Sequence, residues 1–342
     1  MARYDPFRKL LFRLEPERAH RLTLQLLALA GAIPTLRSGL RRIFSIEDRV
    51  LEVRAFGLEF SNPVGLAAGY DKDGQAMHGL ACLGFGHLEL GTVTLEPQEG
   101  NPRPRIFRLT EDQALINRMG FPNQGVDRLL ARLSNRPANI VLGINIGKSA
   151  ETPIQEAALD YTRLMELVYE SADYLAVNIS SPNTVGLREL HGRRYLEGLL
   201  NDLANERERL TSETGKSRPV LVKLAPDLLD SELGEAIGVI QDTGMDGVIV
   251  ANTTTVRTGL HSASKGESGG LSGTPLLQRS TDMIRAVGSK TGGRLPIIGV
   301  GGVFGPHEAR EKLNAGAVLV QLYTGLVYRG PGLVRQILAG IR

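Results

Sequence analysis

The sequence contains no tryptophan and one cysteine, Cys82, and only 5% of its 342 residues are aromatic. A single cysteine excludes a disulfide framework and a metal site built from several cysteines, and it suits a reducing compartment. The six histidines are scattered without metal-ligand spacing, so no metal site is predicted. The leucine-rich stretch at residues 22–33 is too short to cross a bilayer. Glycine is abundant instead, with 40 residues, which suits an α/β protein with many tight turns.

Positive charge is concentrated at the front of the chain. Residues 1–42 carry nine Lys or Arg and three Asp or Glu, whereas the other 300 residues carry 31 and 34. A basic front piece can meet nucleic acid or an anionic membrane surface. Because the aromatic and glycine signatures of nucleic-acid-binding modules are missing, the membrane surface is favoured and no nucleic-acid partner is predicted.

Two short amphipathic helices are predicted in this front piece. Asp5-Pro6 and Glu15-Pro16-Glu17 are both typical helix starts. The apolar faces that follow consist of Phe7, Leu10, Leu11 and Leu14 in the first helix, and of Ala19, Leu22, Leu26 and Leu29 in the second, widened by Leu24 and Leu27. Leucine-rich helices with basic flanks are expected to lie in a membrane interface. The alternative is a helical hairpin that packs on the rest of its own chain.

Short apolar runs alternate with longer segments from residue 64 onward. The eight runs are residues 64–67, 88–90, 140–144, 174–177, 220–222, 248–250, 297–300 and 318–322. Segments of helical length between them include residues 154–169, 195–210, 231–242 and 275–287. Eight alternations predict a (β/α)8 TIM barrel, which typically needs about 250 residues plus insertions. A doubly wound sheet would accept the alternation too, but it needs ligand-binding residues at only one or two points.

Polar or small residues follow every run. They are Ala68-Gly69-Tyr70-Asp71-Lys72, Gly91-Thr92, Asn145-Ile146-Gly147-Lys148, Asn178-Ile179-Ser180-Ser181-Pro182-Asn183-Thr184, Lys223, Asn252-Thr253-Thr254, Gly301-Gly302 and Tyr323-Thr324-Gly325. A barrel brings all eight strand ends to one mouth, where active sites are built. Two of these lysines, Lys72 and Lys223, together with the four asparagines, predict an anionic ligand and a ring that bears amide edges. Any single tip could instead be an ordinary strand cap.

The glycine-rich segment at residues 299–305 resembles a dinucleotide fingerprint only weakly, because no acidic residue follows at the right distance. In a barrel, glycines after the seventh and eighth strands expose backbone N–H groups to a single phosphate, which is the interpretation favoured here. Two insertions, residues 93–139 and 253–273, are expected to form lids or substrate walls. The first could equally be a small β excursion without chemistry, but Asn117 beside Phe121 favours a functional role.

Taken together, the motifs resemble a known family. The segments similar to dihydroorotate dehydrogenase, in order over residues 50–330, are AAGYDKDG, LGTVTLEPQEGNPRPRIFRL, INRMGFPN, NISSPNT, VKLAPD, NTTT, GGLSGTPL, IIGVGG and LVQLYTG. Ser181 stands where the soluble class 1 enzymes usually carry cysteine, and with the front helices it resembles class 2, the quinone-linked branch. The resemblance implies oxidation of (S)-dihydroorotate to orotate in de novo pyrimidine (UMP) biosynthesis.

The resemblance also implies one non-covalent FMN per chain. Its binding residues would be Ala68, Gly69, Tyr70, Asp71, Lys72, Thr92, Asn145, Asn178, Lys223 and Ala251, with Gly273, Gly301, Gly302, Tyr323 and Thr324 toward the phosphate. The residues holding dihydroorotate would be Lys72, Asn117, Arg118, Met119, Gly120, Phe121, Asn178, Asn183, Asn252 and Thr253. Ser181 would be the general base for the C5 proton. Because a serine alkoxide does not form near neutral pH, the proton would leave through Thr184 or a water.

By the same resemblance, residues 1–45 would be a helical extension that binds membrane and quinone, and residues 46–342 the FMN-binding barrel. His20, Arg108 and Tyr323 match family positions that line a tunnel for a membrane quinone. We expect a monomer on the cytoplasmic side of a bacterial inner membrane, held peripherally, since no organelle-import extension precedes the helices.

Two residues depart from the family pattern. Ala251 replaces a hydroxyl residue, so a flavin contact there would be made by the backbone or not at all. Tyr70 replaces a commonly apolar residue, for which the sequence offers no reason. Three other functions stay open: a soluble class 1 enzyme that uses fumarate or NAD, a non-redox phosphate-binding isomerase or lyase, and a membrane-docked scaffold. Ser181 and the front helices disfavour the first, and the polar strand tips disfavour the last.

Overall fold

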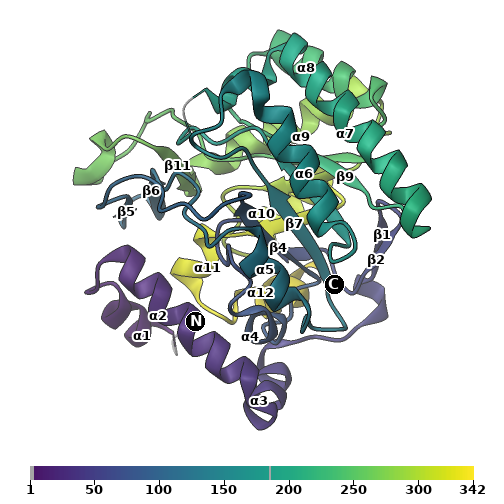
Figure 1. Ribbon diagram of the computed structural model, residues 1–342. Helices are drawn as coiled ribbons and strands as arrows, with labels where there is room; N and C mark the ends of the chain where they lie inside the picture. Colours follow the sequence, from purple (N-terminus) through teal and green to yellow (C-terminus); the bar gives the residue numbers. More distant parts are fainter. Residues whose placement is uncertain (1–3, 185) are drawn as a thin grey trace.

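The computed structural model describes residues 4–184 and 186–342, and its centre is a closed barrel of eight parallel strands (Figure 1). The barrel strands are β3 (Val64–Leu66), β4 (His87–Val93), β7 (Val141–Ile146), β8 (Tyr174–Asn178), β9 (Val220–Leu224), β10 (Gly247–Val250), β12 (Ile297–Val300) and β13 (Leu319–Leu322). Each of the eight predicted runs overlaps one of these strands. The barrel prediction is therefore confirmed, and the doubly wound alternative is wrong, because β10 and β9 close the ring.

Helices form the outer layer around the strands (Figure 1). They are α4 (Met77–Ala81), α5 (Val126–Leu133), α6 (Ala157–Val168), α7 (Arg193–Thr214), α8 (Asp230–Asp242), α9 (Leu277–Thr291), α10 (Pro306–Asn314), α11 (Thr324–Arg329) and α12 (Leu333–Ile341). Short 3₁₀ helices are η1 (Arg49–Leu51), η2 (Ile154–Glu156), η3 (Leu187–His191), η4 (Ala263–Gly266) and η5 (Thr274–Leu276). The four predicted helical segments overlap α6 to α9, and two of them begin in the 3₁₀ helices η2 and η5. Local sequence explains some ends: α7 stops at Gly215, which adopts φ +69.

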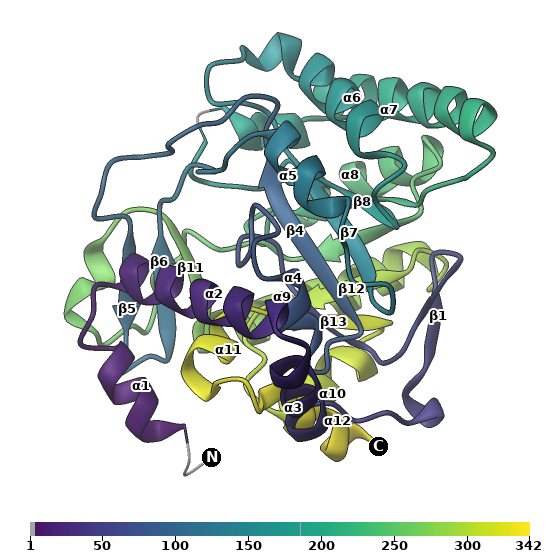
Figure 2. The same cartoon turned by 60° about the horizontal axis from the view of Figure 1, so that its bottom comes forward.

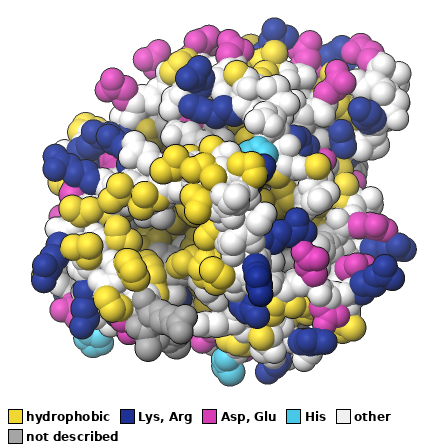
Figure 3. Space-filling view, turned by 90° about the horizontal axis from the view of Figure 1, so that it is seen from below, with side chains coloured by type: hydrophobic (Ala, Val, Ile, Leu, Met, Phe, Trp, Pro, Cys, Tyr) yellow, Lys and Arg dark blue, Asp and Glu magenta, His cyan; other side chains and the backbone are white. Residues whose placement is uncertain are grey.

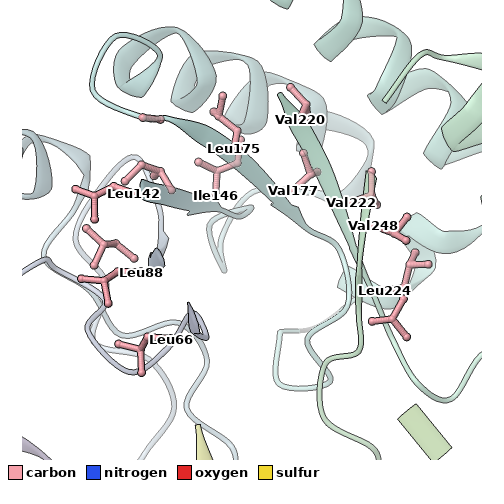
Figure 4. Packing of buried hydrophobic residues seen from close by; sticks show 14 of the residues in the cluster. Leu66, Leu88, Leu142, Ile146, Leu175, Val177, Val220, Val222, Leu224 and Val248 are labelled. Carbon is pink, nitrogen blue, oxygen red and sulfur yellow. The ribbon is translucent and has the colours of Figure 1, made fainter. Parts of the chain in front are cut away.

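Strand side chains alternate between the helix layer and the barrel interior, as the two-residue period of a strand requires. On β9, Val220, Val222 and Leu224 belong to the core between strands and helices (Figure 4). Leu221 belongs to a separate core inside the barrel, and Lys223 shares its inward side. This alternation decides which residues can reach the interior, and it places Lys223 there.

Three helices rather than the predicted two precede the barrel: α1 (Asp5–Leu11), α2 (Pro16–Ala32) and α3 (Pro34–Phe44). Residues 1–3 of the predicted extension lie outside the described residues. The missed helix begins at Pro34, a good first helical position, and the residue before it is extended, which also ends α2. A sequence signal was therefore present at Pro34, but the segment after it lacks a long apolar stripe.

Helix α2 packs against the barrel through α4 and lies beside β5 (Figure 2). A Cβ atom on Gly79 would lie 2.1 Å from the carbonyl oxygen of Leu27, so only glycine allows this approach. One face of α2 thus docks on its own chain, with Ala19 and Leu24 buried, while Leu22 and Leu29 stay exposed. The alternative, packing on the rest of the chain, is thus observed for one face of α2, and the membrane-interface expectation stays a prediction.

Two small sheets complete the fold. The hairpin of β1 (Val53–Ala55) and β2 (Leu58–Phe60) packs against the core inside the barrel. The strands β5 (Ile106–Leu109), β6 (Ala114–Asn117) and β11 (Gly270–Gly273) form a three-stranded sheet that joins the two insertions. The first insertion is thus a β excursion, and β6 ends at Asn117, which brings residues 117–121 to the mouth of the barrel.

Candidate active site

A cavity of about 960 Å³, including the solvent at its opening, lies at the C-terminal ends of the barrel strands. Seven of the eight strands supply wall residues at or just past their ends: Ala68 and Gly69 after β3, Thr92 in β4, Asn178 in β8, Lys223 in β9, Ala251 after β10, Gly301 after β12 and Tyr323 after β13. The carboxyl ends of parallel barrel strands meet at one face, which explains how residues so distant in sequence converge.

Most of the predicted site residues line this one cavity. They are Ala68, Gly69, Lys72, Thr92, Asn117, Met119, Gly120, Phe121, Asn178, Ser181, Asn183, Lys223, Ala251, Asn252, Thr253, Gly273, Gly301, Gly302, Tyr323 and Thr324. Four others, Tyr70, Asp71, Arg118 and Asn145, do not. These four were predicted because they adjoin site residues in the sequence. Whether a side chain points into the cavity, however, depends on the local backbone geometry.

Each of these four side chains has a different environment. The Asp71 carboxylate accepts hydrogen bonds from the backbone N–H groups of Gln75 and Ala76, at 2.8 and 2.7 Å, where α4 begins. Arg118 points away to Glu267, at 2.7 Å. Asn145 lies one layer behind the wall, and its Oδ1 accepts from Thr92 Oγ1 at 2.5 Å and from Asn178 Nδ2 at 3.1 Å. It therefore orients two wall residues.

The fourth, Tyr70, stands between the barrel and the front helices. Its ring makes edge contacts with His20 of α2 and with Tyr323, at centroid distances of 5.0 and 5.6 Å. Burial lowers the pKa of His20 to about 4, so its imidazole is neutral at physiological pH. Tyr70, which the sequence left unexplained, is thus the middle one of three rings in edge-to-face contact.

One end of the cavity carries the lysine and the amides. Lys72 Nζ donates to the carbonyl oxygen of Gly69 at 2.9 Å, and burial lowers the pKa of Lys72 to about 8. Asn183 Nδ2 donates to Asn117 Oδ1 at 3.2 Å, which joins the first insertion to the loop after β8. Asn252 Nδ2 donates to the hydroxyl of Ser180 at 2.9 Å. A cation beside neutral donors and acceptors suits an anionic ring with amide edges.

Ser181 also lines this end and is buried. Its Oγ accepts a hydrogen bond from the backbone N–H of Asn183 at 3.2 Å. The hydroxyl of Thr184 is buried without a hydrogen-bond partner among the described residues. Thr184 itself does not line the cavity, but a buried hydroxyl without a partner can hydrogen-bond to a water beside it.

The opposite end is formed by glycines. Gly273, Gly301 and Gly302 have φ values of +102, +110 and +73, which side chains other than glycine rarely adopt. Near them the hydroxyls of Ser272 and Thr324 lie 2.8 Å apart. Exposed backbone and hydroxyl groups of this kind suit a phosphate.

Two residues of the site, Glu89 and Gln321, were not predicted from the sequence. Glu89, fully buried in β4, binds Lys223 Nζ at 3.1 Å and Gln321 Nε2 at 2.7 Å. Gln321 lines the cavity itself, and its Oε1 has no hydrogen-bond partner among the described residues. A signal existed: Glu89 interrupts the apolar run 88–90, and a buried carboxylate requires a partner.

A second cavity, of about 1470 Å³ including open solvent, lies between the front helices and the barrel. Its walls are mostly apolar and contain the three predicted tunnel residues, His20, Arg108 and Tyr323. Arg108 donates to the carbonyl oxygens of Phe12 and Leu14, at 3.3 and 2.7 Å. Tyr323 lines both cavities, so they meet at this residue.

Exposed apolar side chains surround this second cavity. Nine of the fourteen large exposed hydrophobic residues in the described part of the chain lie on or beside α1, α2 and α3: Phe7, Leu10, Leu14, Leu22, Leu26, Leu29, Ile33, Leu36 and Ile43. Figure 3 shows hydrophobic side chains gathered around a hollow on the underside, with Lys and Arg near the edge. Such a contiguous patch marks an interaction surface.

Two features are absent from residues 4–184 and 186–342. None of the helices there combines the length and apolarity needed to traverse a bilayer. No group of three or more His, Cys, Asp or Glu side chains in that part of the chain could hold a metal ion.

Comparisons with known proteins agree with this geometry. A family model described as dihydroorotate dehydrogenase matches residues 50–342. Proteins named dihydroorotate dehydrogenase (quinone) from Azotobacter vinelandii and Pseudomonas putida are 49% and 47% identical over 339 residues, which cover 99% of this chain and 96% and 98% of theirs. A crystal structure of the Eimeria tenella enzyme with ferulenol superposes with a TM-score of 0.88 at 38% identity, covering 97% of this chain and 93% of that one. The chain therefore belongs to the dihydroorotate dehydrogenase family.

Proposed function

We propose that the chain oxidises (S)-dihydroorotate to orotate in pyrimidine biosynthesis, with FMN as its redox cofactor and a membrane quinone as the final electron acceptor. The observation that carries this proposal is the pair of cavities that meet at Tyr323. One is polar and holds Lys72, Ser181 and Lys223, and the other is apolar and opens among exposed leucines. A reaction with a polar donor and a lipid-soluble acceptor needs both.

The residues present fit one non-covalent FMN per chain. Gly273, Gly301, Gly302 and Thr324 would hold its phosphate through backbone N–H and hydroxyl groups. Ala68, Gly69, Thr92, Asn178, Lys223 and Ala251 would surround the ring, with Asn145 behind them. The unpartnered Oε1 of Gln321 supports this fit, because a ring N–H group would satisfy it. FMN, when bound, supplies a two-electron acceptor.

The substrate would occupy the end with the amides. Lys72 would pair with its carboxylate, and Asn117, Asn178, Asn183 and Asn252 would bind its N–H and C=O edges. Met119, Gly120, Phe121 and Thr253 would close the wall around it and exclude water. Arg118 would contribute through its backbone, because its guanidinium is engaged by Glu267.

Ser181 would remove the C5 proton at its Oγ. The backbone N–H of Asn183 fixes that oxygen in place, and the hydroxyl must pass the proton on as it accepts the new one. The buried hydroxyl of Thr184, three residues along the same loop, is the candidate for the next carrier.

Residues 1–45 would form an extension that opens the apolar cavity toward lipid, and residues 46–342 would form the catalytic barrel. The protein would lie peripherally on the cytoplasmic side of a bacterial inner membrane as a monomer. Arg108 or the neutral His20 would donate a hydrogen bond to a quinone oxygen. The leucines around the opening would enter the interface between water and lipid.

The visible spectrum of the purified protein tests the proposal. We expect a yellow flavin spectrum that bleaches when dihydroorotate is added without oxygen and returns when a quinone is added. Recovery with fumarate or NAD but not with quinone would assign a class 1 type instead. A colourless protein that binds a phosphate ester would assign a non-redox barrel enzyme.

A further inference from the structure

A fully buried carboxylate stands directly behind the wall of the barrel cavity. Glu89 Oε1 accepts hydrogen bonds from Lys223 Nζ at 3.1 Å and from Asn145 Nδ2 at 2.8 Å. Its Oε2 accepts from Gln321 Nε2 at 2.7 Å and from the hydroxyl of Tyr174 at 3.1 Å. The donors come from four strands, β9, β7, β13 and β8, so one side chain ties together half of the barrel.

The surrounding strands make room for this cluster. Gly143 pairs with Glu89 across β4 and β7, and a Cβ on it would lie 2.0 Å from the ring of Tyr174. Gly65 pairs with His87, whose ring lies 2.1 Å from the position of a Cβ there. Two glycines at inward positions thus accommodate two aromatic rings below the cavity.

Glu89 is ionised. Burial alone would raise its pKa, but the charge of Lys223 and the hydrogen bonds from Gln321, Lys223 and Asn145 outweigh burial and hold the pKa below its ordinary value. The neighbouring His87 is neutral, because burial lowers its pKa to about 4. The cluster therefore holds one carboxylate and one ammonium group, a pair without net charge.

A buried ion pair is weak evidence for stability, since apolar residues of similar size are often as stable there. Its donors suggest another role. Lys223 and Gln321 both line the cavity, and Asn145 orients Thr92 and Asn178, which line it as well. Every direct contact between Glu89 and the cavity runs through these three donors.

We propose that Glu89 is a positioning residue that aims Lys223 at the flavin, holds Asn145 behind Thr92 and Asn178, and sets the net charge behind the ring. The proposal rests on the assignment of FMN to this cavity. Reduced FMN bound as an anion carries one more negative charge than oxidised FMN, so charge behind the ring decides which form binds more tightly. With Glu89 in place, the positive charge of Lys223 is balanced.

The test is the ratio of the FMN dissociation constants for the oxidised and the reduced form, obtained by titrating apoprotein anaerobically with each. Glu89→Gln removes the charge but keeps the shape, so we expect relatively tighter binding of reduced FMN and a ratio raised about tenfold or more. Tyr174→Phe removes one donor but no charge, and it should leave the ratio close to that of the unchanged protein. Equal ratios in the three proteins would overturn the proposal.

A second pair of variants covers the case in which Glu89→Gln fails to fold or to bind FMN. Lys223→Met leaves the carboxylate unbalanced and should lower the ratio. The double variant Lys223→Met with Glu89→Gln lacks both charges, and we expect its ratio to be higher than that of Lys223→Met alone. Equal ratios in these two variants would contradict the role of Glu89. If the unchanged protein bound no FMN at all, the proposed function would fail, which is a different result from equal ratios in FMN-binding proteins.

Discussion

The two cavities that meet at Tyr323 differ in the side chains that line them. In the barrel cavity, polar side chains are fixed by their neighbours, as Asn145 fixes Thr92 and Asn178. In the front cavity the walls are apolar, and many of the side chains around its opening are exposed. Fixed polar groups suit a reaction that needs exact placement, whereas an exposed leucine surface suits entry from lipid.

A series of hydrogen bonds also joins the front helices to the barrel cavity. Glu17 of α2 binds the guanidinium of Arg105 through both of its oxygens, at 3.0 and 2.7 Å. Arg105 in turn donates to the carbonyl oxygen of Asn101 at 2.9 Å, and the amide of Asn101 donates to the carbonyl oxygen of Asn183 at 3.1 Å. The front helices thus reach the loop that carries Ser181 by three consecutive contacts.

The largest expected effect lies in the barrel cavity. Ser181→Ala should slow reduction of the flavin by dihydroorotate about 10²- to 10⁴-fold, the usual contribution of a general base. The FMN content should not change, because Ser181 lies at the amide end. Stopped-flow absorbance at the flavin band measures the rate, and reduction by dithionite is the control. A rate close to that of the unchanged protein would remove Ser181 from the mechanism.

The next effect concerns the front helices alone. Leu22→Glu with Leu29→Glu puts two charges on the exposed face of α2, and we expect binding to anionic phospholipid vesicles to fall about 100-fold or more. Leu159→Glu is the control, since Leu159 is also an exposed leucine but lies on α6. Vesicle sedimentation gives the affinities. If all three proteins bound equally, the leucine surface would not be the membrane contact.

A smaller effect follows from Lys72. Because burial lowers its pKa to about 8, the charged form predominates below that pH and falls about tenfold with each pH unit above it. Binding of dihydroorotate should weaken in parallel above pH 8. Lys72→Arg stays charged throughout, so its affinity should be lower but independent of pH. The same slope in both proteins would assign the pH dependence to another group.

The smallest effect is on stability. Burial raises the pKa of Glu17, but hydrogen bonds from Arg105 and Arg103 outweigh it and lower the pKa below 4.5. The ionised Glu17 therefore contributes fully to the free energy of unfolding at pH values above its pKa in the unfolded chain. This contribution is lost as the pH falls through its lower pKa in the folded protein. Glu17→Gln should destabilise by about 1–3 kcal/mol at neutral pH, and by progressively less below pH 4.5.

Thermal unfolding of that variant between pH 3.5 and 7 measures the difference. Glu47→Gln is a suitable control, because Glu47 pairs with Arg41 at an exposed site where such pairs contribute little. A difference between Glu17→Gln and the unchanged protein that stayed constant with pH would rule out the charge of Glu17 as its source.

Sequence and structure agree best where a pattern is local. Apolar runs flanked by polar tips predicted all eight barrel strands, and most of the chosen tip residues share one cavity. The directions of side chains were harder, because they depend on neighbours far along the chain. Arg118 turns to Glu267, 149 residues later. Glu89 was missed because its partner Lys223 is 134 residues away.

The central claim is that one flavin is reduced from the barrel cavity and reoxidised from the front cavity. Measuring the two half-reactions separately, without oxygen, tests it in Ser181→Ala and in Thr23→Phe, which would fill the front cavity where Thr23 lines it. We predict that Ser181→Ala slows only reduction by dihydroorotate and Thr23→Phe slows only reoxidation by quinone. If both variants slowed the same half-reaction, the two cavities would not serve separate steps and the account would be wrong.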